Sequence, residues 1–358
     1  MRGLWRKFAI VAVAAVAVAI VAVLLCQAQV GMWVYNRAAV QRVAAPPLGA
    51  GSGIVAGLCG TGSPMPGSTR AGACTVILAG KHAFVVDAGE GSARNLVRMG
   101  IDPGRVDAVF LTHFHSDHID GLGPLNLLHW TGAAARSPLP LFGPQGVEQV
   151  ASGFRQAYAL DHGYRFAHHG DAIAPASGGT FQAISFGAPT QPTVVFEQDG
   201  VRVTAFPVNH RPVVPAVGYR FDYRGRSVVV SGDTAQSPSL EHAAKGADLL
   251  IHEALQPRML ASLTGALEHA GRGNTARITR DIVGYHATPE QAAQSASRAG
   301  VRALALTHLV PPLPNRFFYP AFLGDAAENF SGPISVGEDG MVFTLPAGST
   351  EIREATRF

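Results

Sequence analysis

The sequence predicts an α/β (α+β) fold in which short buried strands alternate with helices, and three observations support this prediction. Apolar segments at 106–111, 227–231 and 301–306 have the length and composition of buried strands. Segments that favour helices, such as 92–99 and 145–160, lie between segments of this kind. Each of the three apolar segments ends in a His or Asp motif, which indicates that strand ends supply the side chains of a functional site.

The N-terminal segment is typical of a membrane anchor. Residues 8–26 form a continuous apolar run of about nineteen residues, close to the minimum for a membrane span. Arg2, Arg6 and Lys7 precede the run, so its start should stay in the cytoplasm while the rest of the chain is exported. We therefore expect residues 1–30 to be a signal-anchor in the inner (cytoplasmic) membrane, with the globular domain in the periplasm or exterior. A cleaved signal, which would give a secreted protein, is the alternative.

A short stalk should separate this anchor from the globular part. Residues 31–52 end in a Pro- and Gly-rich stretch typical of a linker, so residues 53–358 are predicted to form one domain. The first fifty residues hold five basic and no acidic residues, which leaves 23 of the chain's 28 basic residues against all 25 acidic ones. The globular part therefore lacks the basic excess expected of a nucleic-acid binder.

The globular part should open with strands at 54–59, 74–78 and 83–86. Cys59 and Cys74 lie on the first two of these strands. They either form a disulfide in an exported domain or fill the core as small hydrophobic side chains.

The stretch from His113 to His118 holds four side chains that bind metal ions well. His113 and His115 are two residues apart, so they point to the same side of an extended chain. Asp117 and His118 follow where the chain turns toward a helix, and they aim at a second point nearby. Imidazole nitrogen and carboxylate oxygen are ligands of zinc and similar ions. A solvated His-rich loop is the alternative, but it gives no reason for this spacing.

Three further candidate ligands, His210, Asp233 and His308, end strands in the second half of the chain. Seven ligands suit two adjacent ions if one carboxylate bridges them, and Asp233 is the natural bridge. The first predicted ligand set is His113, His115, His210 and Asp233. The second predicted ligand set is Asp117, His118, Asp233 and His308.

The order of these motifs resembles the metallo-β-lactamase superfamily, and the resemblance covers residues 53–345. Further motifs look like the branch that holds the tRNA 3′-processing ribonuclease (ribonuclease Z) and the alkyl- or arylsulfatase-like enzymes. These motifs are Gly60-Thr-Gly-Ser-Pro64, Gly218-Tyr-Arg-Phe221, Ser231-Gly-Asp-Thr234, His252-Glu253, Tyr285-His286-Ala-Thr288 and Leu306-Thr-His308.

The resemblance implies a four-layer αβ/βα sandwich, with two mixed sheets face to face, helices outside, and two metal ions at one edge. It also implies a hydrolase that uses a bridging hydroxide on two Zn²⁺ per chain, with Mn or Fe as alternatives. Asp117 should bind one ion and accept a proton from water, and His286 should protonate the leaving group. Thr288 is predicted to cap the helix that follows His286. The residues expected to support the ligands from behind are Asp87, His252 and Glu253; Asp87 could equally be a turn residue.

The expected substrate is a small phosphodiester or sulfate ester, because no basic arm for tRNA is evident and an exported domain would meet no tRNA. A ribonuclease Z-like enzyme facing the cytoplasm is the first alternative. A non-catalytic, membrane-anchored metal-binding protein is an alternative of another class. The expected partners are the small ester and, through the N-terminal helix, the membrane; nucleic acid is not expected. A homodimer is suggested only by analogy with the ribonuclease branch.

Overall fold

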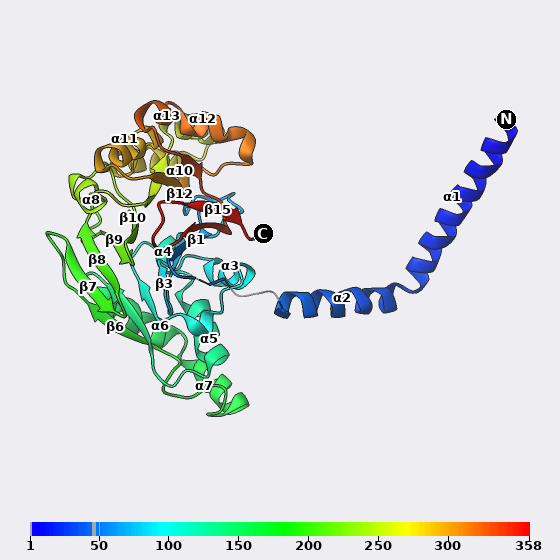
Figure 1. The fold of residues 1–358 in the computed structure, drawn as a ribbon, viewed down its shortest axis with the longest axis horizontal. Helices are drawn as coiled ribbons and strands as arrows, with labels where there is room; N and C mark the ends of the chain where they lie inside the picture. The colour runs from blue at the N-terminus through cyan, green and yellow to red at the C-terminus, as the bar shows by residue number, and fades with distance from the viewer. Residues whose placement is uncertain (1, 45–47, 50) are drawn as a thin grey trace. The chain divides into compact units, whose positions relative to one another are not determined.

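The N-terminal unit of the computed structural model consists of two helices. The structure describes residues 2–44, 48–49 and 51–358, and the chain divides into two units between residues 47 and 48. Helix α1 (Arg2–Leu25) contains a segment, Gly3–Leu25, that is long and apolar enough to cross a membrane, with a mean hydropathy of 3.2. Helix α2 (Gln27–Ala44) follows it (Figure 1).

Most of the predicted stalk is therefore helical, because α2 extends to Ala44. The Pro- and Gly-rich remainder includes residues 45–47 and 50, which lie outside the described residues. The predicted division of the chain at residues 30 and 52 stays a prediction.

Two mixed β-sheets form the centre of the second unit (Figure 1). The first sheet has the order β15-β14-β1-β2-β3-β4-β5-β6, with strands β1 (Ile54–Gly60), β2 (Cys74–Ala79), β3 (His82–Val86), β4 (Ala108–Phe110), β5 (Leu139–Gly143), β6 (Phe181–Ser185), β14 (Met341–Leu345) and β15 (Arg353–Thr356). The second sheet has the order β13-β12-β11-β10-β9-β8-β7, with strands β7 (Thr193–Gln198), β8 (Val201–Pro207), β9 (Val217–Tyr223), β10 (Arg226–Val230), β11 (Leu249–Leu255), β12 (Ala303–Val310) and β13 (Ile334–Val336).

Helices connect the strands of both sheets. The helices after β3, β4 and β5 are α3 (Ser92–Arg98), η1 (Pro103–Arg105), α4 (Ser116–Ile119), α5 (Leu122–Ala133), α6 (Val147–Ala157) and α7 (Ala159–His169). Those of the second half are α8 (Pro238–Ala243), α9 (Pro257–His269), α10 (Gly273–Asp281), η2 (Ile282–Tyr285), α11 (Pro289–Ala299), η3 (Arg316–Phe318), α12 (Tyr319–Leu323) and α13 (Ala326–Asn329).

The layers follow from the alternation of side chains along the strands. Ile54 and Leu58 of β1 pack in one cluster with Val201 of β8, so this cluster lies between the two sheets. Val55 and Cys59 of β1 belong to a second cluster, which lies between the first sheet and the helices on its outer face. A third cluster joins the second sheet to α8 and α11. Because both faces of the central strands are covered, strands such as β1, β2 and β11 are buried along their whole length, whereas β6, β7 and β15 carry polar and exposed residues. The predicted four-layer αβ/βα sandwich is confirmed.

Some local predictions were wrong. Residues 178–192 carry little signal in the sequence and were interpreted as a loop, but residues 181–185 form β6, which pairs in parallel with β5 (Leu139–Gly143). The helix expected at 145–160 ends at Ala157, and a second helix, α7, begins at Ala159.

The two sheets also do not correspond to two consecutive halves of the chain. The C-terminal strand β14 returns to pair with β1 of the first sheet. Strand β7, the next strand after β6 of the first sheet, belongs to the second sheet. Pairings of this kind depend on contacts between distant segments, which the local sequence pattern does not encode.

Cys59 and Cys74 form a disulfide between β1 and β2. Both residues are buried, and β1 and β2 are adjacent antiparallel strands. The disulfide closes the loop that contains Pro64, Met65 and Pro66, three residues that line the pocket described below. Of the two roles left open for these cysteines, the structure therefore selects the disulfide.

Candidate metal centre

The candidate site lies where the ends of several strands meet. β10, β11 and β12 run parallel, so their carboxyl ends lie at the same edge of the second sheet. Asp233 follows β10, and His308 is the extra residue where the pairing of β11 with β12 shifts by one. Such a bulge turns a side chain in a new direction. His113 follows β4 of the first sheet, and His210 follows β8.

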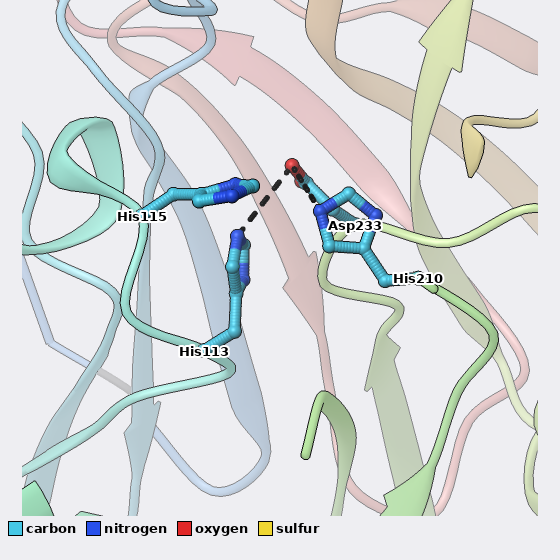
Figure 2. A group of neighbouring side chains, drawn as sticks. All are labelled: His113, His115, His210 and Asp233. Atoms are coloured by element: carbon cyan, nitrogen blue, oxygen red, sulfur yellow. Dashed lines mark ion pairs between the residues drawn. The ribbon is translucent and has the colours of Figure 1, made fainter. Parts of the chain in front are cut away.

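Three imidazoles and a carboxylate form the first cluster, shown in Figure 2: His113, His115, His210 and Asp233. Their ligand atoms lie within 4.8 Å of one another. Nε2 of His113 and Nε2 of His210 each stand 3.8 Å from Oδ2 of Asp233. His115 is partly exposed, whereas the other three side chains are buried.

Asp117, His118 and His308 form the second cluster. Oδ2 of Asp117 lies 3.0 Å from Nε2 of His308 and 3.5 Å from Nε2 of His118. Oδ2 of Asp233 also lies near this cluster, 3.4 Å from Nε2 of His118 and 3.5 Å from Nε2 of His308. The structure thus brings together all seven predicted ligands in the two predicted sets, with Asp233 between them.

The donor atoms have the arrangement expected of metal ligands. Two ligands that each stand about 2.1 Å from a tetrahedral ion lie about 3.4 Å from each other. The distances around Asp233, 3.4 to 3.8 Å, are close to this value and too long for hydrogen bonds. The buried Nε2 atoms of His113, His118 and His210, and Oδ1 of Asp233, also have no hydrogen-bond partner among the described residues. Since unpartnered buried polar atoms are costly, the residues fit divalent metal ions.

Hydrogen bonds at the far side of the rings orient these imidazoles. Nδ1 of His118 lies 2.8 Å from Oδ2 of Asp87, and Nδ1 of His210 lies 3.1 Å from the carbonyl oxygen of Tyr285. Nδ1 of His113 is 3.1 Å from the hydroxyl of Thr112, which itself donates to Asp87. Each of the three rings is therefore left with Nε2 directed at the cluster. The predicted contact of Asp87 behind the ligands is present, whereas the contribution of Thr112 was missed.

The loop after β3 packs closely against the loop of residues 113–118. Its backbone conformation is constrained at two positions. Asp87 has a φ of 57°, in the left-handed region that residues other than glycine rarely adopt. At Gly89, a Cβ atom would lie 2.1 Å from the carbonyl oxygen of Asp117. A glycine is required there because the two loops pass too close for any side chain.

The charges of the cluster are balanced by protons when no metal is bound. Burial alone would lower the pKa of His118, but the carboxylates of Asp233 and Asp87 raise it well above the usual value. Burial would raise the pKa of Asp233, but the imidazoles of His308 and His118 hold it well below its usual range. Burial keeps the pKa of His113 low, so that this ring is neutral. Metal ions would displace the protons of His118 and His308, because ligands bind metals in their deprotonated form.

A second functional group, the pair of Glu253 and His286, adjoins the clusters. Oε1 of Glu253 lies 2.8 Å from Nδ1 of His286 and accepts from the backbone N–H of Thr234, the residue after Asp233. Burial lowers the pKa of His286, but the carboxylate of Glu253 more than offsets this and raises it to about 9. His286 precedes α11, where Thr288 forms the predicted helix cap as a capping box with Gln291.

The remaining histidines have other surroundings. His252 is buried, and its Nδ1 lies 2.7 Å from the backbone carbonyl of its neighbour Glu253, so it supports that residue. His162 packs edge-on against Trp130, 4.9 Å between ring centroids, and His82 lies 2.9 Å from Asp199.

A pocket of about 350 Å³ opens beside the two clusters. Asp117, Asp233, His115, His308 and His286 are among the residues that line it. The other lining residues are mostly apolar and come largely from the β1–β2 loop, α10, η2 and β12, and these were missed from the sequence. The only signal available was the amphipathic pattern of 273–281, which does not indicate what the helix faces.

Comparison with known proteins identifies the fold family. Residues 82–309 match the family described as beta-lactamase superfamily domain. The structure resembles the metallo-beta-lactamase fold protein YhfI from Bacillus subtilis, with a TM-score of 0.59 and 22% identity over 81% of this chain and 98% of that one. It resembles the short form of human tRNase Z equally, with a TM-score of 0.59 and 21% identity over 82% and 99% of the two chains. The chain belongs to the metallo-β-lactamase superfamily.

Sequence similarity defines the branch within this superfamily. The chain is 37% identical to the ribonuclease Z of Mycobacterium bovis (strain BCG / Pasteur 1173P2) over 285 residues, which cover 79% of this chain and 95% of that protein. This similarity assigns the chain to the ribonuclease Z branch, and the chain is a metal-dependent hydrolase that acts on ester bonds.

Replacing Asp87 tests the support behind the ligands. We predict that Asp87→Asn lowers zinc affinity about 10–100-fold, because an amide offers one acceptor oxygen where the carboxylate offers Oδ1 to Thr112 and Oδ2 to His118. Competition with a chelator measures the affinity. Asp102→Asn, at a surface residue that caps η1, is the matched control and should leave affinity unchanged. Equal zinc affinity in the wild type and Asp87→Asn would contradict the prediction.

Proposed function

We propose that this chain is a phosphodiesterase that holds two divalent metal ions and cleaves RNA. The observation that carries the proposal is the joint presence, at one pocket, of seven metal-ligand side chains and the Glu253–His286 pair. Relatives named ribonuclease Z support RNA as the substrate better than the small ester expected from the sequence. Zinc is the ion that suits this nitrogen- and oxygen-donor set, although manganese or iron would also use it.

In this proposal the ligand residues are those of the two clusters, with Asp233 shared between them. Two ions held there would supply an activated water and would stabilise the negative charge that develops on the phosphate oxygens. Asp117, which lines the pocket, would bind one ion and accept a proton from the attacking water.

His286 supplies the proton that the leaving group needs. Its Nδ1 is held by Glu253, so the opposite nitrogen remains available to the pocket that the residue lines. Without metal bound, and against the opposing effect of burial, the carboxylate of Glu253 raises the pKa of His286 to about 9, so this contact favours the protonated form that a proton donor needs. The carboxylate of Glu253 fixes the ring and stabilises its charged form.

A small phosphodiester or sulfate ester is the second candidate substrate. The specific observation in its favour is the size of the pocket, about 350 Å³, which is near the lower limit for small-molecule sites. A site of this size encloses one compact group beside the metal ions.

Turnover of three substrates tests the function directly. The zinc-loaded full-length chain in detergent should cleave a precursor tRNA with a higher kcat/KM than a nitrophenyl phosphodiester, and it should leave a nitrophenyl sulfate unreacted. Asp117→Ala should abolish turnover while retaining the fold by circular dichroism. Turnover of the sulfate alone would favour the second candidate, and no turnover of any ester would support the non-catalytic alternative.

The role of His286 predicts a dependence on the leaving group. We expect His286→Ala to lower kcat about 10²–10⁴-fold for an RNA substrate, whose leaving alkoxide requires a proton. For a nitrophenyl phosphodiester the loss should be less than about tenfold, because nitrophenolate leaves without a proton. His242→Ala, at an exposed histidine of α8, is the matched control. Equal losses for both substrates would contradict proton donation by His286.

We also propose that α1 anchors the chain in the cytoplasmic membrane and that the catalytic domain faces the exterior, in which case its RNA substrate lies outside the cytoplasm and precursor tRNA serves only as a test substrate. The apolar helix, the basic residues before it and the Cys59–Cys74 disulfide support this location, because disulfides persist mainly in oxidising compartments. Alkaline phosphatase fused after residue 358 should then be active. Activity of a cytoplasmic reporter in the same position would contradict export and would agree with a ribonuclease that meets cytoplasmic RNA.

A further inference from the structure

The apolar wall of the pocket is built from four elements of the fold. Met65 comes from the β1–β2 loop, Ile278 from α10, Ile282 from η2 and Val310 from β12. Met65 and Ile282 also pack against the buried cluster of Leu255, Leu260 and Val310 at the base of α9. The wall is therefore backed by core residues and is formed before any ligand binds.

The composition of the wall indicates the chemistry of its ligand. Among the described residues that line the pocket there is no Lys or Arg, and the acidic ones, Asp117 and Asp233, belong to the metal clusters. The other polar residues that line the pocket, apart from its histidines, are Ser116, Thr275, Thr279 and Tyr285. A group that carries its own phosphate or carboxylate would have no cation to pair with there. The wall thus suits an uncharged, apolar group.

The position of His286 identifies which part of the ester this group is. A proton donor must come within about 3 Å of the oxygen that leaves. His286 lines the same pocket as Ile282 and directly follows Tyr285, so the leaving oxygen lies at the edge of the apolar wall. The carbon group attached to that oxygen then extends along the wall, whereas the phosphate remains at the metal clusters.

We propose that the wall formed by Met65, Ile278, Ile282 and Val310 is a subsite for the uncharged and preferably aromatic part of the leaving group that lies next to the leaving oxygen. The inference rests on the proposed hydrolysis of phosphodiesters and adds the substrate class that the site selects. An aryl or benzyl alcohol and the base of a single nucleoside share this chemistry. Ile278 is the residue to change, because its side chain is 60% exposed on α10 and the fold does not depend on it.

Two diesters that differ only in the leaving alcohol test the subsite. For the zinc-loaded full-length chain in detergent, kcat/KM should be at least about tenfold higher for methyl benzyl phosphate than for methyl ethyl phosphate. Ile278→Ala should lower the value for the benzyl ester about tenfold and leave the ethyl ester within about twofold. Val283→Ala removes a partly exposed side chain of η2 that does not line the pocket, and it should change neither value.

A variant that introduces a positive charge on the wall should gain activity on a negatively charged substrate. Simple loss of packing would not produce such a gain. Methyl 4-carboxybenzyl phosphate should be a poor substrate of the wild type. Ile278→Lys should raise kcat/KM for this ester, relative to the value for the benzyl ester, by about tenfold or more.

A dinucleoside monophosphate and its two abasic forms distinguish the sources of the aromatic group. A loss confined to one abasic form assigns the subsite to a nucleobase; equal turnover of all three, with the benzyl preference retained, assigns it to an aryl or benzyl alcohol.

The outcomes separate failure of the subsite from failure of the function. Equal kcat/KM for the benzyl and ethyl esters, together with no effect of Ile278→Ala, would overturn the subsite but leave phosphodiester hydrolysis intact. Turnover of none of these diesters by the wild type would overturn the proposed function and with it the subsite.

Discussion

The buried carboxylate of Asp233 is the group on which the arrangement of the site depends. One of its oxygens faces Nε2 atoms of four histidines at 3.4–3.8 Å, and its other oxygen has no hydrogen-bond partner among the described residues. An ionised carboxylate that is 3% exposed is costly unless positive charge compensates it. Protonated imidazoles supply that charge without metal, and two cations would supply it more completely. The strand ends that meet here must therefore be held accurately by both sheets.

Glu253 connects this centre to His286, the proposed proton donor. Its Oε1 accepts from the backbone N–H of Thr234, next to Asp233, and also contacts His286. Because β10 and β11 are adjacent parallel strands, Asp233, which follows β10, and Glu253, which lies in β11, are near the same edge of the sheet. The carboxylate of Asp233 and the carboxylate that holds His286 are thus positioned by the same pair of strands. The apolar wall of the pocket is formed by other elements. These are α10, η2, β12 and the β1–β2 loop that the disulfide closes.

The candidate ligand residues that the structure brings together could be named from the sequence because their positions follow from local patterns. The close spacing of His113, His115, Asp117 and His118, and the polar residues after apolar strands, required no knowledge of long-range pairing. The helix cap at Thr288 was likewise a local signal.

The pairing of β14 with β1 and the existence of β6 depend on distant partners, so the local sequence did not predict them. The pocket wall escaped for the same reason, since Ile278 and Met65 meet only in the folded chain. The preference for a small ester over RNA rested on the lack of an evident basic arm and on the predicted export of the domain, and relatives named ribonuclease Z weigh against it.

The number and position of the metal ions is the measurement that tests the central claim most directly. A crystal structure of the zinc-loaded full-length chain, with anomalous scattering collected on both sides of the zinc edge, would locate each ion. We predict two zinc peaks per chain, one among His113, His115 and His210 and the other among Asp117, His118 and His308, with Asp233 bound to both. A single peak, or two peaks of which only one contacts Asp233, would contradict the account.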